Sequence, residues 1–143
     1  MSWLLLTYKL AAEPSARRVY IWRKLKRLGA ITIFEAVWVL PDSPRTHEQF
    51  QWLTVEIQEM GGEAMFWKAQ AELSGQEDAL IQFFSSQVDQ AYLELLAKME
   101  QPDADSGKVS QLYQQIRQRD YFQTALGQQV RERLLVIREG EVS

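Results

Sequence analysis

The sequence predicts an α+β protein in which a small antiparallel sheet carries two helices on one face and a run of helices follows. Two observations lead to this prediction. In the first half of the chain, short apolar stretches of strand length alternate with segments of helical period. After residue 73 only the helical period remains. We therefore expect a core over residues 1–73 and a helical extension over residues 74–143, packed on that core within a single domain.

The chain opens with a short apolar stretch, Trp3–Leu10, that contains neither glycine nor proline. We expect a central strand that is buried on both faces. Pro14 ends this stretch, and Ser15 is the expected N-cap of a helix over Ala16–Leu28. Gly29 is expected to end that helix as the residue that follows its C-cap.

Two further strands are expected over residues 30–36 and 37–40, with a tight connection near Phe34. No Asn-Gly or Asp-Gly pair marks that connection, so its turn type stays open. An amphipathic helix is expected over Thr46–Met60, and a strand over Glu63–Leu73, where apolar and polar residues alternate. The order strand, helix, strand, strand, helix, strand is that of the ferredoxin-like βαββαβ fold.

The second half of the chain predicts three helices. A long helix is expected over Gln76–Met99, and a polar segment over residues 101–107 separates it from helices over Lys108–Arg119 and Ala125–Ile137. Residues 139–143 are expected to fray. The long helix carries apolar residues on more than one face, which favours burial partly against the core and partly against a second subunit. We therefore expect a homodimer.

Composition excludes several classes of function. The chain has 143 residues, a net charge of −3 and no cysteine, so disulfides, thiolate metal sites and cysteine catalysis are absent. The apolar runs are far shorter than a bilayer span, and no secretory signal opens the chain. A cytoplasmic protein without a membrane partner is expected. Scattered carboxylates and a single histidine, His47, predict no catalytic residues, no metal site and no cofactor.

The first predicted helix concentrates positive charge. Its apolar residues Ile21, Trp22, Leu25 and Leu28 fall within an arc of roughly 120°. Most of its cations fall outside that arc, which predicts a surface for phosphate groups, either on DNA or on another polyanion. The alternatives are a solvated face that keeps the protein soluble, or a site for an oxyanion such as chromate. The candidate binding residues are Arg17, Arg18, Arg23, Lys24, Lys26 and Arg27, out of 16 Lys and Arg in the chain.

The tryptophans are expected mainly in the core. Trp3, Trp22 and Trp38 lie on predicted apolar faces, where they would pack between helix and sheet. Trp52 lies off the apolar stripe of its helix and is a candidate partner contact. His47 is expected to have a surface or capping role.

The segment from Arg119 to Phe122 marks a helix end. We expect Arg119 and Asp120 to form a structural ion pair, with Tyr121 and Phe122 docking the last helices on the sheet. In the alternative, Arg119 contributes to the anion or DNA surface.

These motifs together resemble the N-terminal domain of ChrB-type chromate-resistance proteins. The resemblance implies a bacterial cytoplasmic protein connected with chromate-responsive regulation, with DNA as a ligand. The residues that carry it are Trp3-Leu4-Leu5-Leu6, Tyr8-Lys9-Leu10, Glu13-Pro14-Ser15, Arg17-Arg18-Val19, Trp22-Arg23, Val37-Trp38-Val39-Leu40-Pro41, Trp52-Leu53, Gly61-Gly62-Glu63-Ala64, Trp67 and Arg119-Asp120-Tyr121-Phe122.

The first strand and helix also resemble the ferredoxin-like middle domain of PaaX-type repressors and the small CRISPR-associated integration subunit. Nuclease-like members of that group end the first strand in Tyr-Asp, with the aspartate as metal ligand. The matching pair here is Tyr8-Lys9, and an ammonium group cannot bind a hard divalent cation. A metal-dependent nuclease is therefore disfavoured.

The sequence thus predicts a nonenzymatic regulatory protein that binds DNA or another polyanion through its basic helix, with Lys9 and Arg119 as possible accessory residues. The alternative is a protein-interaction scaffold or dimerisation module that acts through Trp52 and the last helices without nucleic acid.

Overall fold

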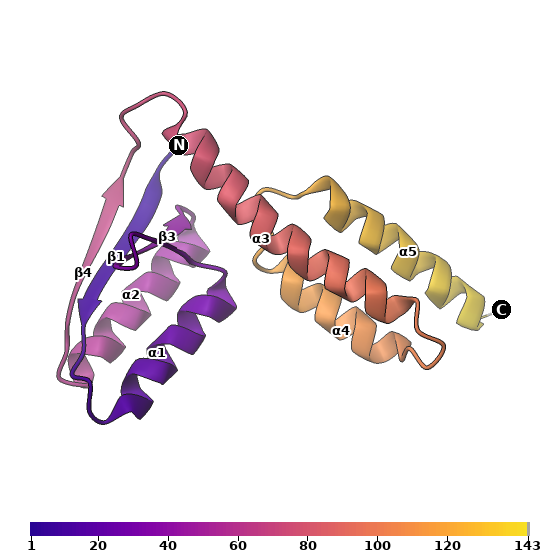
Figure 1. Cartoon of the computed structure of the whole chain (residues 1–143), viewed down its shortest axis with the longest axis horizontal. Coiled ribbons are helices and arrows are strands. Elements are labelled where there is room, and N and C mark those ends of the chain that lie inside the picture. The colour runs from indigo at the N-terminus through magenta and orange to yellow at the C-terminus, as the bar shows by residue number, and fades with distance from the viewer. Residues whose placement is uncertain (143) are drawn as a thin grey trace. The chain divides into compact units, whose positions relative to one another are not determined.

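The computed structural model describes residues 1–142, with side chains described through Gly140. The chain is α+β, as predicted, and forms two compact units, one over Met1–Glu77 and one that begins at Asp78 (Figure 1). The elements in order are β1 (Trp3–Lys9), α1 (Ser15–Leu28), β2 (Ile31–Ile33), β3 (Val37–Pro41), α2 (Pro44–Glu59), β4 (Glu63–Ala69), α3 (Gln76–Met99), α4 (Ser106–Arg117) and α5 (Ala125–Val142).

The strands of the first unit form a sheet in the order β2-β3-β1-β4, and every neighbouring pair is antiparallel. This is the strand order of the ferredoxin-like fold that the element pattern predicts. β1 is central, as expected. The strand is buried on both faces only at its start, where Trp3 and Leu4 are buried. Its side chains become more exposed toward Lys9.

Both helices of the first unit cover the same face of the sheet (Figure 1). Leu6 pairs in register with Trp38 on one side and Phe66 on the other, so these three side chains share a face. The Phe50 ring of α2 lies edge-on to Phe66, with ring centroids 6.0 Å apart. The Lys26 ammonium of α1 lies 5.8 Å from the Trp38 ring. Each large apolar side chain that is fully buried here stabilises the unit by about 1.5–3 kcal/mol.

The helix ends confirm one sequence prediction and correct another. Gly29 has φ 77° and ends α1, as expected. Ser15 is not the N-cap: it is the first helical residue, Pro14 occupies the cap position, and no side chain caps the helix. α2 begins two residues earlier than predicted, at Pro44, because Ser43 and Thr46 form a reciprocal capping box.

The connection between β2 and β3 is a tight turn in which two non-glycine residues are left-handed. Phe34 has φ 53° and Glu35 has φ 61°, and the Ala36 amide donates to the Ile33 carbonyl over 3.2 Å. Positive φ at both central positions is the mark of a type I′ hairpin turn. The sequence carries no Asn-Gly signal here because Phe34 and Glu35 occupy the two left-handed positions that Asn and Gly usually take, at a steric cost.

The second unit is a helical cluster with its own core. One stripe of α3 faces α4 and α5, whereas Phe83 and Leu93 of α3 are exposed. α4 begins at Ser106 rather than Lys108, because the Asp105 carboxylate caps its first turn. α5 continues through Val142, past the predicted end at Ile137. The last residue of the segment that is expected to fray, Ser143, lies outside the described residues. The core residues are Val88, Tyr92, Leu95, Met99, Val109, Tyr113, Ile116, Val130 and Leu134.

The β4 strand is shorter than predicted and ends at Ala69. Within residues 1–142, no helix combines the length and the apolar character needed to cross a membrane.

Candidate polyanion interface on the first helix

The helix α1 is anchored to the sheet by a narrow apolar side. Ile21 and Leu25 are fully buried and Leu28 is half-buried. Trp22 lies at the edge of this apolar side and is 50% exposed, so the prediction that it packs in the core is wrong. Trp3 and Trp38 are buried as predicted, but alternation along β1 and β3 leaves only Trp38 on the sheet face that α1 and α2 cover. At about 100° per residue, Trp22 is far enough from the centre of the buried arc to reach solvent.

Two of the six predicted binding cations have partners on α2. The Arg17 guanidinium donates to the Met60 carbonyl over 2.8 Å, at the end of α2. The Lys24 ammonium forms an ion pair with Glu56 at 2.7 Å. The hydrogen bond within this ion pair raises the pKa of Lys24 above its ordinary value, and a smaller contribution comes from the contact with Tyr20. Both side chains therefore help to hold α1 against α2.

The other four cations, Arg18, Arg23, Lys26 and Arg27, are exposed. None of them has an acidic ion-pair partner among the residues that the structure describes. Arg23 and Arg27 are one helical turn apart, where like charges cost a few tenths of a kcal/mol. No residue of α1 is acidic, although the chain contains 19 Asp and Glu. The positive charge of these residues is therefore not balanced by an acidic residue of the same helix.

Aromatic groups lie beside this band. The Lys26 ammonium lies 5.6 Å from the ring of exposed Trp22 and 5.8 Å from that of Trp38. Cation–π contacts of this kind contribute about 0.5–1 kcal/mol at exposed sites. They hold the Lys26 ammonium close to Trp22, so a cation and a flat apolar surface are presented together.

Near the start of α1, Arg18 lies within electrostatic reach of Tyr8 at the end of β1. Burial raises the pKa of the Tyr8 phenol, and the Arg18 charge partly opposes that rise. The Tyr8 side chain is thus neutral at pH 7.

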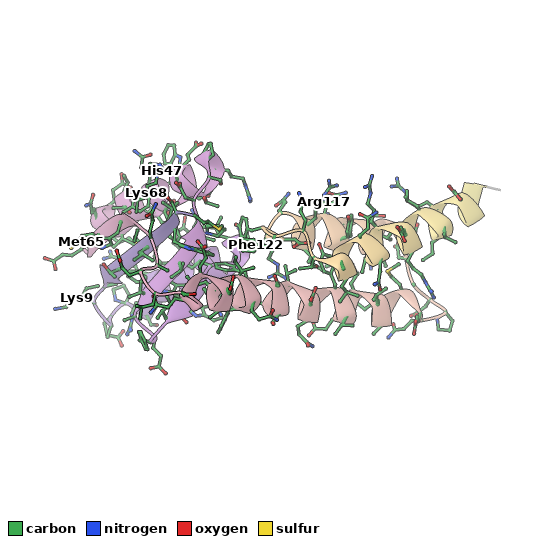
Figure 2. All side chains as sticks on the ribbon, turned by 90° about the horizontal axis from the view of Figure 1, so that it is seen from above. Lys9, His47, Met65, Lys68, Arg117 and Phe122 are labelled. Carbon is green, nitrogen blue, oxygen red and sulfur yellow. The ribbon has the colours of Figure 1, made fainter. Side chains whose placement is uncertain are left out.

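Of the two predicted accessory residues, only Lys9 belongs to the same unit as this band. Lys9 is exposed at the end of β1, opposite Glu63 in register, and its side chain projects outward (Figure 2). Because side chains alternate along a strand, Lys9 is on the sheet face opposite to that of Tyr8 and the helices. Arg119 follows α4 in the second unit and is half-buried.

The segment around Asp120 differs from the prediction. Its carboxylate does not pair with Arg119 but accepts the Tyr92 hydroxyl over 2.9 Å and the Thr124 amide over 3.2 Å. Tyr121 and Phe122 pack within the second unit, with ring centroids 6.1 and 6.0 Å from that of Phe84. The motif therefore joins the helices of the second unit.

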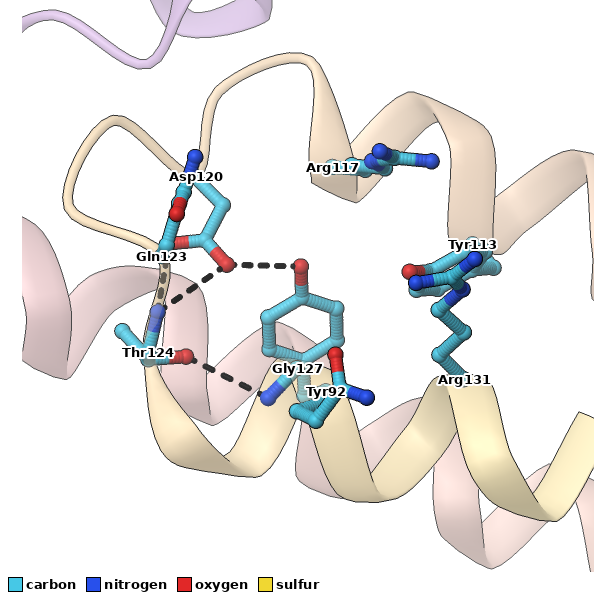
Figure 3. A pocket seen from close by; sticks show the side chains of 9 residues that line it. Tyr92, Tyr113, Arg117, Asp120, Gln123, Thr124, Gly127 and Arg131 are labelled. Atoms are coloured by element: carbon cyan, nitrogen blue, oxygen red, sulfur yellow. Dashed lines mark hydrogen bonds between the residues drawn. The ribbon is translucent and has the colours of Figure 1, made fainter.

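A polar pocket of about 320 Å³ lies beside Tyr92 and Asp120 in the second unit (Figure 3). Sequence reasoning missed it, because its arginines, Arg117 and Arg131, come from different helices without a shared spacing. The local signal that existed was Thr124, which directly precedes α5 and whose hydroxyl accepts from the Gly127 amide over 3.3 Å, as an N-cap does.

Two further residues are exposed, as the sequence predicts. His47 is exposed, and its ring lies 4.9 Å from that of Phe66. Trp52 is 59% exposed, as its off-stripe position predicts, and its indole donates to Glu48. Within the described residues, no group of three or more His, Asp or Glu side chains is placed to hold a metal ion.

Comparison with known proteins identifies a family over a region that begins within α1 and ends in α4. The family described as "Protein ChrB, N-terminal" matches residues 18–108. The protein named Protein ChrB from Cupriavidus metallidurans is 30% identical over 76 residues, which cover 53% of this chain and 24% of that relative. The aligned region thus spans about a quarter of the relative's length. No solved structure matches the chain.

Proposed function

This chain belongs to the ChrB N-terminal family, and we propose that it is a nonenzymatic regulatory protein of chromate resistance that binds duplex DNA through the exposed side of α1. The observation that carries this proposal is the acid-free band formed by Arg18, Arg23, Lys26 and Arg27, which lacks ion-pair partners in the described residues. At about 100° per residue, Arg23, Lys26 and Arg27 lie within an arc of about 100°, and Arg18 lies nearer the start of the helix, about 80° around from Lys26. Hereafter this set is called the α1 cationic band.

The chemistry of the band fits a phosphate backbone. Each cation that neutralises a phosphate releases condensed counterions, which supplies sequence-independent affinity. Arginine guanidinium groups bind phosphate oxygens through two parallel hydrogen bonds. The net charge of −3 disfavours DNA binding over the whole surface, so the contact is confined to this helix. We further propose a cytoplasmic homodimer, which would present two such bands to a symmetric site.

The test is the salt dependence of binding to a fluorescently labelled DNA duplex, measured by anisotropy with the full chain. Four phosphate contacts predict a slope of about −3.6 for log K against log salt concentration. Affinity should then fall about 150-fold between 50 and 200 mM NaCl. The double variant Arg23→Gln with Arg27→Gln should halve the slope, to about −1.8, and weaken binding at 50 mM salt by at least tenfold.

The matched control removes two positive charges elsewhere. Arg133 and Arg138 are exposed on α5, so Arg133→Gln with Arg138→Gln changes the net charge equally. It should leave the slope near that of the unchanged protein. Equal weakening by both double variants, or no binding by the folded protein at 50 mM salt, would refute the proposal.

A protein-interaction scaffold is the second candidate, and the exposed pair Trp52 and Val55 on α2 supports it. Exposed tryptophans are enriched at the centres of protein interfaces. In that case Trp52→Ala would abolish capture of a protein partner, and the α1 variants would have no effect on function.

A further inference from the structure

The pocket of the second unit is lined by side chains from three helices. Tyr92 comes from α3, Tyr113 and Arg117 from α4, and Arg131 from α5. Its volume of about 320 Å³ lies at the lower end of the range for small-molecule sites. Most of its lining is polar, so a charged or strongly polar ligand is favoured over an apolar one.

The positive charge of the pocket is available. Neither Arg117 nor Arg131 forms an ion pair among the described residues, and both are exposed. Figure 3 shows both guanidinium groups and Tyr113 on one side of the Tyr92 ring, with Asp120 and Thr124 on the other side. Two guanidinium groups on one side of a cavity match the geometry of carboxylate and phosphate groups.

The carboxylate of Asp120 forms no ion pair with Arg117 or Arg131 among the described residues. It accepts the Tyr92 hydroxyl over 2.9 Å and the Thr124 amide over 3.2 Å, and these two bonds fix its orientation on the other side of the Tyr92 ring. Gly127 leaves the space in which this arrangement fits, because a Cβ there would lie 2.9 Å from the Asp120 oxygen. The negative group is therefore held against the pocket wall, and the cationic side remains open.

We propose that this pocket binds the oxyanion group of a small molecule, a phosphate or a carboxylate, between Arg117 and Arg131. The whole pocket, about 320 Å³, has about ten times the volume of roughly 30 Å³ that one water occupies in the liquid. It accommodates an organic body whose polar groups meet Gln123 and Gln128. The site is formed by residues of the second unit, whereas the α1 cationic band belongs to the first, and it does not depend on DNA binding.

The experiment is calorimetric titration of the full chain with two probes, inorganic phosphate and ribose 5-phosphate, at constant ionic strength. We expect saturable binding, weakened at least tenfold by Arg117→Gln and by Arg131→Gln. Arg138→Gln, on the same helix but outside the pocket, should not change it. Both pocket arginines are exposed, so their replacement should leave the fold intact, which circular dichroism checks.

The two probes separate the sources of the anion. Tighter binding of the sugar phosphate supports an organic ligand, and equal binding of both supports the free oxyanion. No binding of either probe at 10 mM would overturn the proposal. Binding that survives both pocket variants but is lost in Arg23→Gln with Arg27→Gln would also overturn it, because the anion would then lie on α1.

Discussion

Replacing Gly127 by alanine tests the packing that joins the three helices of the second unit. An added Cβ would lie 2.8 Å from Cε2 of Tyr92 and 2.9 Å from Oδ2 of Asp120. Real Cβ atoms do not approach other heavy atoms so closely, so the Tyr92 ring must move. Tyr92 is almost fully buried and donates its hydroxyl to Asp120, so the movement breaks a hydrogen bond as well as a packed contact.

Two effects of opposite sign compete in this variant. Alanine is favoured over glycine inside a helix by about 1 kcal/mol. Overpacking costs about 1–3 kcal/mol, and a polar group left without its partner costs about 1–3 kcal/mol more. The steric effect wins, and we expect a net loss of about 2 kcal/mol in the free energy of unfolding.

Urea unfolding followed by two signals measures this loss. All five tryptophans lie in the first unit, between Trp3 and Trp67, so tryptophan fluorescence reports that unit, whereas circular dichroism at 222 nm reports helices in both. With a slope near 2 kcal/mol per molar urea, the midpoint of the helical transition should fall by about 1 M.

Gly140→Ala is the matched control, because it lies on the same helix and its added Cβ meets nothing within 4 Å. It should leave stability unchanged or raise it slightly. A Gly127→Ala midpoint equal to that of Gly140→Ala would refute the reasoning, because Tyr92 and Asp120 would then have moved aside without cost.

Two further predictions concern pH and the hairpin turn. Burial, with the hydrogen bond to Asp120, raises the pKa of the Tyr92 phenol, so above about pH 10 the unfolded chain loses a proton that the folded chain retains. The contribution of Tyr92 to the free energy of unfolding should therefore be complete below that pH and should fall as pH rises, by up to about 1.4 kcal/mol per pH unit. Urea midpoints measured from pH 8 to 11 should fall less for Tyr92→Phe than for the unchanged protein. Equal falls in the two proteins would contradict this assignment to Tyr92. In the turn, Phe34→Asn with Glu35→Gly should stabilise the first unit by about 1–2 kcal/mol, because both positions are left-handed and Phe34 is 91% exposed. An unchanged or lower fluorescence midpoint would show that these residues carry no strain.

The element order of the chain could be predicted because its signals are local. The change from strand to helical period marks each element, and Gly29 ends α1 through its own backbone freedom. Boundaries were less predictable. The start of α2 depends on a reciprocal hydrogen bond between Ser43 and Thr46, and the start of α4 depends on the Asp105 cap.

The candidate interface could be predicted only in part. The composition of α1 was visible in the sequence, but which of its cations remain available was not. Arg17 and Lys24 meet partners on α2 that are 43 and 32 residues further along the chain. A helical wheel places Trp22 on the apolar side of α1, but it does not show how far the sheet extends beneath that side. In the structure the sheet leaves Trp22 half exposed.

By itself the sequence determined the α+β class, the order of the elements and the concentration of cations on one acid-free helix, because each of these follows from neighbouring residues. The tertiary structure decided which cations are paired, where Trp22 lies, and that Arg117 and Arg131 share a pocket with Tyr92. These properties depend on distances between helices that are remote in sequence, and no local period contains that information.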